Sequence, residues 1–152
     1  MDEIVIRPAV LNECDALTDL CLRSKGWWGY DNAFIEACRE DLTVTQQDIG
    51  GIFRVAELNG RLAGVVQVTR DGNEWSLGAL FIAPPFIGRG IGAALMLWAI
   101  DAAREQGARR LVIEAEPGAV AFYRRFGAVD DGVAASTALP GRFIPRLVLQ
   151  LS

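Results

Sequence analysis

The residues best suited to chemistry lie in the turn of "PPFIGRGIGAALMLW", residues 84–98. Gly88, Gly90 and Gly92 allow a left-handed backbone and let a ligand approach the main chain closely. A helical apolar pattern follows at once, so the first N–H groups of a helix point outward without intrahelical partners. Together with the helix dipole and Arg89, these groups predict a cradle for a phosphate or diphosphate. A tight turn whose glycines serve packing alone is the alternative.

Two familiar nucleotide motifs fit this turn poorly. The sequence contains no GxxxxGK[ST], which excludes a P-loop nucleotidase. The segment "GRGIGA" does match the relaxed dinucleotide pattern G-x-G-x-x-[GA]. A nicotinamide site, however, needs a short parallel strand–turn–helix unit, and here an antiparallel meander and a Pro-Pro loop precede the turn. An oxidoreductase is therefore the weaker alternative.

Other catalytic chemistries are limited by missing residue types. The chain has no histidine, which removes Ser-His and Cys-His nucleophiles and makes a zinc site improbable, so we expect no metal. Cys14, Cys21 and Cys38 lack CxxC spacing and suit reduced, mostly buried thiols in a cytoplasmic protein. The N-terminus lacks a signal-peptide pattern, and no apolar stretch approaches the roughly eighteen residues of a membrane span, so no membrane partner is expected.

Composition is that of a globular protein, and residues 1–152 are expected to form a single domain. Hydrophobic residues make up 51% and charged residues 22% of the chain. The formal net charge of −4 argues against nucleic acid as a partner and suits a cationic substrate.

The elements that must position the turn are strands and helices in mixed order. Alternating and β-branched segments predict strands, helical periodicity predicts helices, and Asn59-Gly60 predicts a type I′ hairpin. Asn12 is the expected cap of the first helix, Asp31 or Asn32 that of the second, and Gly107 the end of the third. The expected strands are 3–9, 52–58, 61–70, 74–82, 109–116, 129–137 and 143–151, and the expected helices 13–23, 32–40, 88–107 and 118–128. This order predicts an α/β (α+β) fold, one mixed sheet covered by helices.

Two blocks of the sequence, "LGALFIAPPFIGRGIGAAL" and "LVIEAEPGAVAFYRRFGA", resemble the GNAT N-acetyltransferase superfamily. The element order fits that superfamily over essentially the whole chain. Gly90 and Gly92 match its acetyl-CoA signature [QR]-x-x-G-x-[GA], whereas Ile87 stands where Gln or Arg is usual. The second block fits A-x-F-Y-x-[KR]-x-G-[FA], although Gly118 replaces an Asn that often contacts the cofactor arm.

The resemblance implies a central, mostly antiparallel sheet with helices on both faces. Strands 74–82 and 111–116 should be parallel neighbours that splay apart, and pantetheine should pair with the end of the first. A backbone N–H of Phe81 or Leu80 would then polarise the thioester carbonyl. Acetyl-CoA is thus the expected co-substrate, bound by Leu80, Phe81, Ile82, Ala83, Ile87, Gly88, Arg89, Gly90, Ile91, Gly92, Ala93 and Tyr123.

Catalytic roles follow from the same resemblance. Tyr123 lies where the family places the acid that protonates the leaving thiolate, and its ordinary pKa of about 10 keeps it protonated at neutral pH. The base is open: relatives carry a carboxylate where this chain has Ser76, and Glu74 lies two residues earlier on the same face. Two further carboxylates could relay a proton through water, and four arginines could meet the 3′-phosphate of coenzyme A. These are Glu114 and Glu116, and Arg109, Arg110, Arg124 and Arg125.

The acceptor side is predicted from "WWGY", residues 27–30, in the connection between the first two helices. Trp27, Trp28 and Tyr30 could hold an alkylammonium group by cation–π contact, or they could form an aromatic plug that pins the helices. The C-terminal tail, residues 139–151, could form a wall of the acceptor pocket or a contact in a homodimer. The sequence thus predicts an acetyl-CoA-dependent N-acetyltransferase acting on a small-molecule primary amine by direct attack in a ternary complex. The alternative is a non-catalytic acyl-CoA sensor with the same fold.

Overall fold

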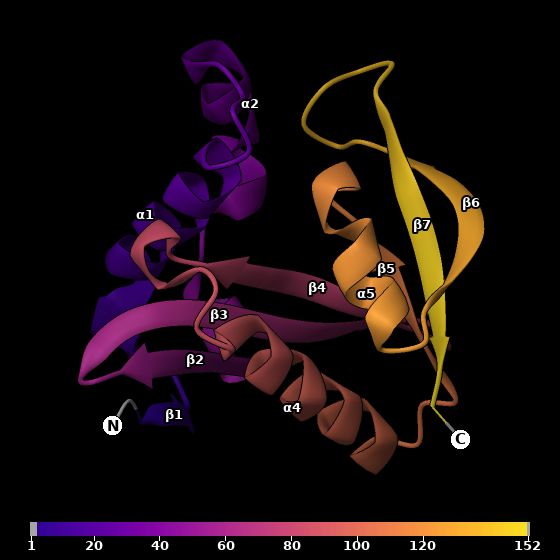
Figure 1. Ribbon diagram of the computed structural model, residues 1–152, viewed down its shortest axis with the longest axis horizontal. Helices are drawn as coiled ribbons and strands as arrows, with labels where there is room; N and C mark the ends of the chain where they lie inside the picture. The colour runs from indigo at the N-terminus through magenta and orange to yellow at the C-terminus, as the bar shows by residue number, and fades with distance from the viewer. Residues whose placement is uncertain (1–2, 152) are drawn as a thin grey trace.

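A seven-stranded mixed sheet forms the centre of the fold, and the computed structural model describes residues 3–151 (Figure 1). Its strands lie in the order β1-β2-β3-β4-β5-β7-β6, and only the β4–β5 pair is parallel among the described residues. The mostly antiparallel sheet predicted from the sequence is confirmed. The strands are β1 (Ile4–Arg7), β2 (Ile52–Leu58), β3 (Arg61–Asp71), β4 (Glu74–Ile82), β5 (Arg110–Glu114), β6 (Val129–Ala135) and β7 (Phe143–Gln150).

The helices lie between these strands in the expected order, with one short addition. They are α1 (Cys14–Gly26), α2 (Asn32–Leu42), α3 (Gln46–Gly50), α4 (Ile91–Glu105) and α5 (Val120–Arg125). Three single 3-10 turns precede helices: η1 (Leu11–Glu13), η2 (Pro84–Phe86) and η3 (Pro117–Ala119). The sequence predicted no helix at α3, where Thr45 and Asp48 cap each other reciprocally.

Helices cover both faces of the sheet, as predicted. Gly64 of β3 lies against α4, because a Cβ there would meet Leu95 Cδ1 at 2.9 Å and Ile91 Cγ2 at 3.1 Å. Val65, the next residue, shares a cavity wall with Cys21 of α1. Since successive side chains of a strand point to opposite faces, α1 and α4 cover opposite sides. Helix α5 lies on the α4 side, where its Phe122 packs near the start of α4.

Local signals for turns and caps were mostly correct. Asn59 and Gly60 have φ of 53° and 80°, the left-handed pair that a type I′ hairpin requires. The Asp31 side chain accepts a hydrogen bond from Phe34 N at 2.8 Å and caps α2. The prediction that Asn12 caps the first helix is wrong, because η1 continues directly into α1 and no side chain caps that helix.

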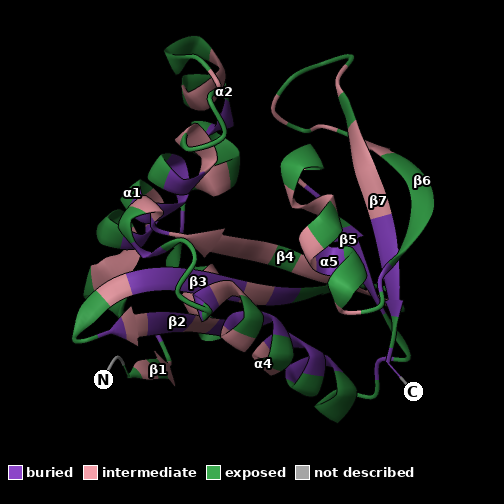
Figure 2. Ribbon diagram, in the orientation of Figure 1, coloured by how far each residue is buried: buried purple, intermediate pink, exposed green. Residues whose placement is uncertain are grey.

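The core lies between the sheet and its helices on both faces, and the buried residues concentrate along β2, β3, β5 and the inner side of α4 (Figure 2). Each fully buried aliphatic or aromatic side chain contributes about 1.5–3 kcal/mol by leaving water. No helix within residues 3–151 is long and apolar enough to cross a membrane. The largest fully buried side chains are Leu17, Leu20, Phe53, Val55, Leu58, Val65, Ile91, Leu95, Met96, Leu111, Ile113 and Leu147.

Candidate active site

Strands β4 and β5 separate soon after they meet, and this opens the centre of the sheet. Within the described chain their ladder holds one registered pair, Ser76 with Val112. A β-bulge leaves Gly78 unpaired opposite β3, and a bulge bends its strand. A Cβ on Gly78 would lie 2.8 Å from Thr69 Cγ2, so a larger residue would displace the Thr69 side chain. Figure 1 shows β4 and β5 pointing in different directions, which confirms the predicted splay.

The free edge of β4 presents backbone N–H groups to this gap. Ala83 N donates to Ala63 O of β3 at 2.8 Å. Because the hydrogen-bonding direction alternates along an antiparallel strand, Phe81 also faces β3, whereas Leu80 and Ile82 face the gap. Of the two N–H groups considered for the thioester carbonyl, the geometry therefore favours Leu80. The Ile82 N–H is held by Ser24 Oγ of α1 at 3.2 Å, a contact that sequence reasoning missed.

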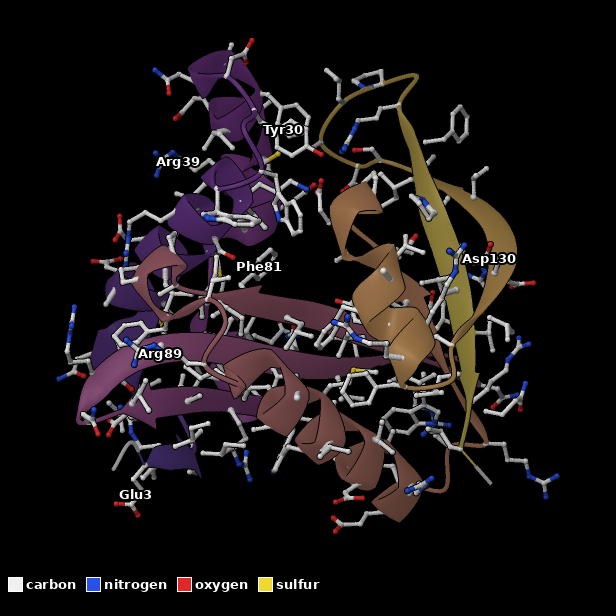
Figure 3. The ribbon with its side chains drawn as sticks, in the orientation of Figure 1. Glu3, Tyr30, Arg39, Phe81, Arg89 and Asp130 are labelled. Carbon is white, nitrogen blue, oxygen red and sulfur yellow. The ribbon has the colours of Figure 1, made fainter. Side chains whose placement is uncertain are left out.

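The glycine turn has the backbone geometry of an anion cradle. Gly88 and Gly90 have φ of 83° and 82°, and a Cβ at either position would meet no atom within 4 Å. Helix α4 begins at Ile91, not at Gly88, because Gly90 is its left-handed N-cap. The first intrahelical bond runs from Ala94 N to Gly90 O at 3.1 Å, so the preceding N–H groups lack intrahelical partners. Arg89 is exposed on this turn (Figure 3).

A cavity of about 500 Å³ lies on the α1 side of the sheet, within the size range of small-molecule sites. Its floor is formed by β3, β4 and the end of β5, and its walls by α1, α2, α3 and the β6–β7 connection. The C-terminal tail therefore shapes this pocket. The lining includes Ser76, Phe81 and Glu114 from the floor, Cys21, Lys25, Cys38 and Asp41 from the helices, Ser136 and Thr137 from the start of the β6–β7 connection, and Arg142 and Ile144 from the tail.

Two cavity-lining thiols are poor nucleophiles. Cys21 and Cys38 are 2% and 3% exposed, in keeping with the core positions expected for them. Burial raises the pKa of the Cys21 thiol to about 12. Burial also raises the pKa of Cys38, against the smaller opposing effect of the Lys25 and Arg142 charges. Both side chains thus stay protonated at neutral pH, and the thiolate is the reactive form.

Tyr123 lies on α5, among core residues and outside the lining of the cavity. Its side chain is 7% exposed, and its ring packs edge-on against Phe122 at 5.2 Å between centroids. Burial raises the pKa of this phenol well above its ordinary value near 10. The group therefore keeps its proton across the physiological range, as a proton donor must.

The four residues considered for proton removal fall in three different places. Ser76 and Glu114 line the cavity. Glu74 lies outside the lining and pairs with Arg146 at 3.3 Å. Glu116 pairs with Lys25 at 2.7 Å across the gap between α1 and the end of β5. The structure brings Ser76 and Glu114 together on the cavity floor and leaves Glu74 apart.

The aromatic residues of the acceptor prediction also separate. Trp27 and Trp28 are 51% and 40% exposed and pack edge-on with centroids 4.9 Å apart. Trp28 covers Gly118, where a Cβ would lie 2.3 Å from Trp28 Cζ3. The indole thus occupies the space of the Asn that is usual at this position. Tyr30 instead joins a polar cluster with Lys25 and Glu116 that no sequence signal singled out as a unit.

The chain belongs to the acetyltransferase (GNAT) family, whose model matches residues 16–128. A GCN5-related N-acetyltransferase from Rhodopseudomonas palustris is 19% identical, with a TM-score of 0.79 over 97% of this chain and 95% of its own. PaiA N-acetyltransferase from Thermoplasma acidophilum, solved with coenzyme A, is 17% identical, with a TM-score of 0.71 over 97% and 99%. YncA from Salmonella typhimurium, solved with its cofactor acetyl-CoA, is 22% identical, with a TM-score of 0.68 over 99% and 95%.

At these identities the likeness shows the fold, and no curated protein matches the chain. The same fold overturns the dinucleotide alternative. Residues 83–90, which include the η2 turn, separate the end of β4 from the start of α4, so the connection is not the short strand–turn–helix loop of a dinucleotide site.

Proposed function

We propose that the protein transfers the acetyl group of acetyl-CoA to a primary amine of a small molecule, by direct attack in a ternary complex. The observation that carries the proposal is the splay of β4 from β5, with the Leu80 N–H group turned into the gap. An extended ligand with amide groups can add to such an edge as a strand would. Family membership supports the same assignment.

The turn after η2 would hold the diphosphate. The outward N–H groups of Gly90, Ile91, Gly92 and Ala93 supply donors, and the open space above Gly88 and Gly90 lets phosphate oxygens approach. Ile87 takes the place of the usual Gln or Arg without loss of these main-chain donors. Acetyl-CoA, when bound, supplies an activated thioester, and the chain's own groups do the rest.

Two groups would act on the thioester end. The Leu80 N–H lies where it can polarise a carbonyl in the gap, and such a donor is worth several kcal/mol when it is aimed at developing negative charge. Tyr123 would protonate the leaving thiolate, because it stands where the family places this acid and its phenol is protonated at neutral pH. Ile82 N–H and Ser24 would help to fix the end of β4.

The amine would enter from the cavity, which lies on the α1 side of the sheet, opposite the face that α4 covers. An alkylamine is protonated at neutral pH and must lose a proton before it attacks. We assign the relay to Glu114 and Ser76, which line the cavity, and not to Glu74, whose carboxylate is held by Arg146. The protonated thiols of Cys21 and Cys38 favour direct attack over an acetyl-enzyme. Three free cysteines also lead us to place the protein in the cytoplasm.

The test is thiol release from acetyl-CoA across a panel of primary amines, with Tyr123→Phe beside the wild type. Arg39→Gln is a matched control, because Arg39 is exposed on α2 and pairs only with Glu36 among its described neighbours. We expect amine-dependent release that Tyr123→Phe slows and Arg39→Gln does not. A protein that binds coenzyme A yet releases no thiol with any amine would be a sensor, and the proposal would be wrong.

A further inference from the structure

A cluster of charged and aromatic side chains joins α1, the α1–α2 connection and the tail, and its Lys25 and Arg142 line the cavity. Lys25 Nζ lies 2.7 Å from Glu116 Oε2, and the Tyr30 hydroxyl donates to the other Glu116 oxygen. Arg142 Nη2 donates to the Tyr30 hydroxyl at 2.7 Å. Figure 3 shows Tyr30 reaching from the α1–α2 connection towards the β6–β7 connection. The cluster thus joins residues 112 positions apart in sequence.

The cluster contains two positive charges, Lys25 and Arg142, and one carboxylate, Glu116. Glu116 gives one carboxylate oxygen to Lys25 and the other to Tyr30, so its acceptor capacity serves these two partners. Arg142 contacts the phenol and the faces of two rings, with its Cζ 5.2 Å from the Tyr30 centroid and 4.9 Å from that of Phe34. Within residues 3–151 no carboxylate lies within ion-pair distance of the Arg142 guanidinium. One positive charge is left without an anion.

This unpaired guanidinium faces the cavity. Arg142 is half-buried and lines the pocket, and one of its five N–H donors is used on Tyr30. The aromatic faces of Tyr30 and Phe34 hold the planar group in place, so little side-chain freedom remains to be lost on binding. A fixed guanidinium with free donors is suited to the two oxygens of a carboxylate, which it can bind in a bidentate manner.

Apart from Lys25, which pairs with Glu116, the other charged groups of the lining are carboxylates. Asp41, Asp48 and Glu114 also face the cavity. Asp41 accepts a hydrogen bond from Thr137, and Asp48 accepts one from Gln67 at 3.0 Å. The pocket therefore combines carboxylates, which suit an ammonium group, with one cation that lacks an anion.

We propose that the acceptor is an amine that also carries a carboxylate, and that Arg142 binds this carboxylate while the amine lies over the Ser76 and Glu114 floor. This inference rests on the proposed function and names the class of its acceptor. Arg142 is then a residue that sets substrate specificity, and Tyr30 and Phe34 position it.

The experiment compares matched pairs of amines that differ only in carboxylate against carboxamide. The probes are glycine, β-alanine and γ-aminobutyrate, each beside its amide, so that the chain length between the two groups also varies. For each pair, kcat/KM is measured by thiol release, and binding is measured by calorimetry in the presence of coenzyme A. At least one acid should exceed its amide roughly tenfold or more in both measurements, the worth of a charge-assisted hydrogen bond.

Variants separate recognition from structure. Arg142→Gln should bring the acid-to-amide ratio near one, Arg142→Lys should restore part of it, and the exposed Arg39→Gln should leave it at the wild-type value. Wild-type protein that acetylates acids and amides equally well would overturn this inference and leave the proposed function standing. Equal loss with acid and amide in Arg142→Gln would also overturn it. Absence of coenzyme A binding would instead overturn the proposed function, and the acid-against-amide calorimetry would still test the cavity.

Discussion

The contact between Gly118 and Trp28 allows one prediction to be worked out from the structure. In Gly118→Ala, the new Cβ would lie 2.3 Å from Trp28 Cζ3 and 2.7 Å from Cε3, so the indole must move. Overpacking of this kind costs about 1–3 kcal/mol. Because Trp28 is 40% exposed and can turn towards solvent, we expect the lower part of that range, about 1–2 kcal/mol. For a chain of this size, that lowers Tm by roughly 2–8 °C.

The clash should vanish when the indole is removed. Gly118 is not among the glycines with positive φ, so alanine fits its backbone once Trp28 is gone. In a Trp28→Ala background, Gly118→Ala should be neutral or stabilising by about 0.4–1 kcal/mol, because it restricts the unfolded chain. Urea unfolding of the four proteins in this cycle gives the coupling energy, which we expect to exceed about 1 kcal/mol. Gly50→Ala is the control, since its Cβ would meet nothing within 4 Å. Equal destabilisation in both backgrounds would refute the reasoning.

Three further perturbations have outcomes set by the structure. Tyr123→Phe removes the proposed acid and should lower kcat about 10²–10⁴-fold, a larger factor than any loss of coenzyme A affinity that calorimetry shows; an unchanged kcat would exclude Tyr123 as the acid. Ser24→Ala leaves the half-buried Ile82 N–H without its acceptor and should cost about 0.5–1.5 kcal/mol in urea unfolding, and a cost near zero would show that the contact is dispensable. The hydrogen bond from Arg7 lowers the pKa of Glu13, so its contribution to stability is present above the ordinary glutamate pKa and is lost as pH falls through the lowered value. The stability difference between wild type and Glu13→Gln should therefore shrink on acidification from neutral pH, and a pH-independent difference would contradict the ion pair.

Local patterns in the sequence were enough to predict most of the fold. The Asn59-Gly60 hairpin, the Asp31 cap and the left-handed Gly107 just after the end of α4 each depend on residues close together in the chain. The splay of β4 from β5 was predicted from the family resemblance and not from local patterns. The predicted Asn12 cap was wrong because a polar residue caps a helix only where its own backbone is extended. Asn12 lies within η1, so its backbone is helical.

The cavity and its charges could not be predicted in this way. The Lys25–Glu116 pair joins residues 91 positions apart, and the Arg142–Tyr30 bond joins residues 112 positions apart. Contacts at such separation depend on tertiary packing, which composition and periodicity do not encode. The resemblance showed that Gly118 stands where relatives often have Asn. Only the fold shows that the Trp28 indole fills the space of that side chain. In the same way, Glu74 shares a strand face with Ser76, yet Arg146 of β7 holds it away from the cavity.

The central claim is that main-chain N–H groups at residues 88–93 bind the diphosphate of coenzyme A. Calorimetric titration of the folded protein with coenzyme A tests it most directly, with Gly90→Ala as the matched variant because its φ of 82° strains any larger residue. We predict saturable heat for the wild type and clearly weaker binding for Gly90→Ala. A folded wild-type protein that gives no heat with coenzyme A at millimolar concentration would contradict the claim.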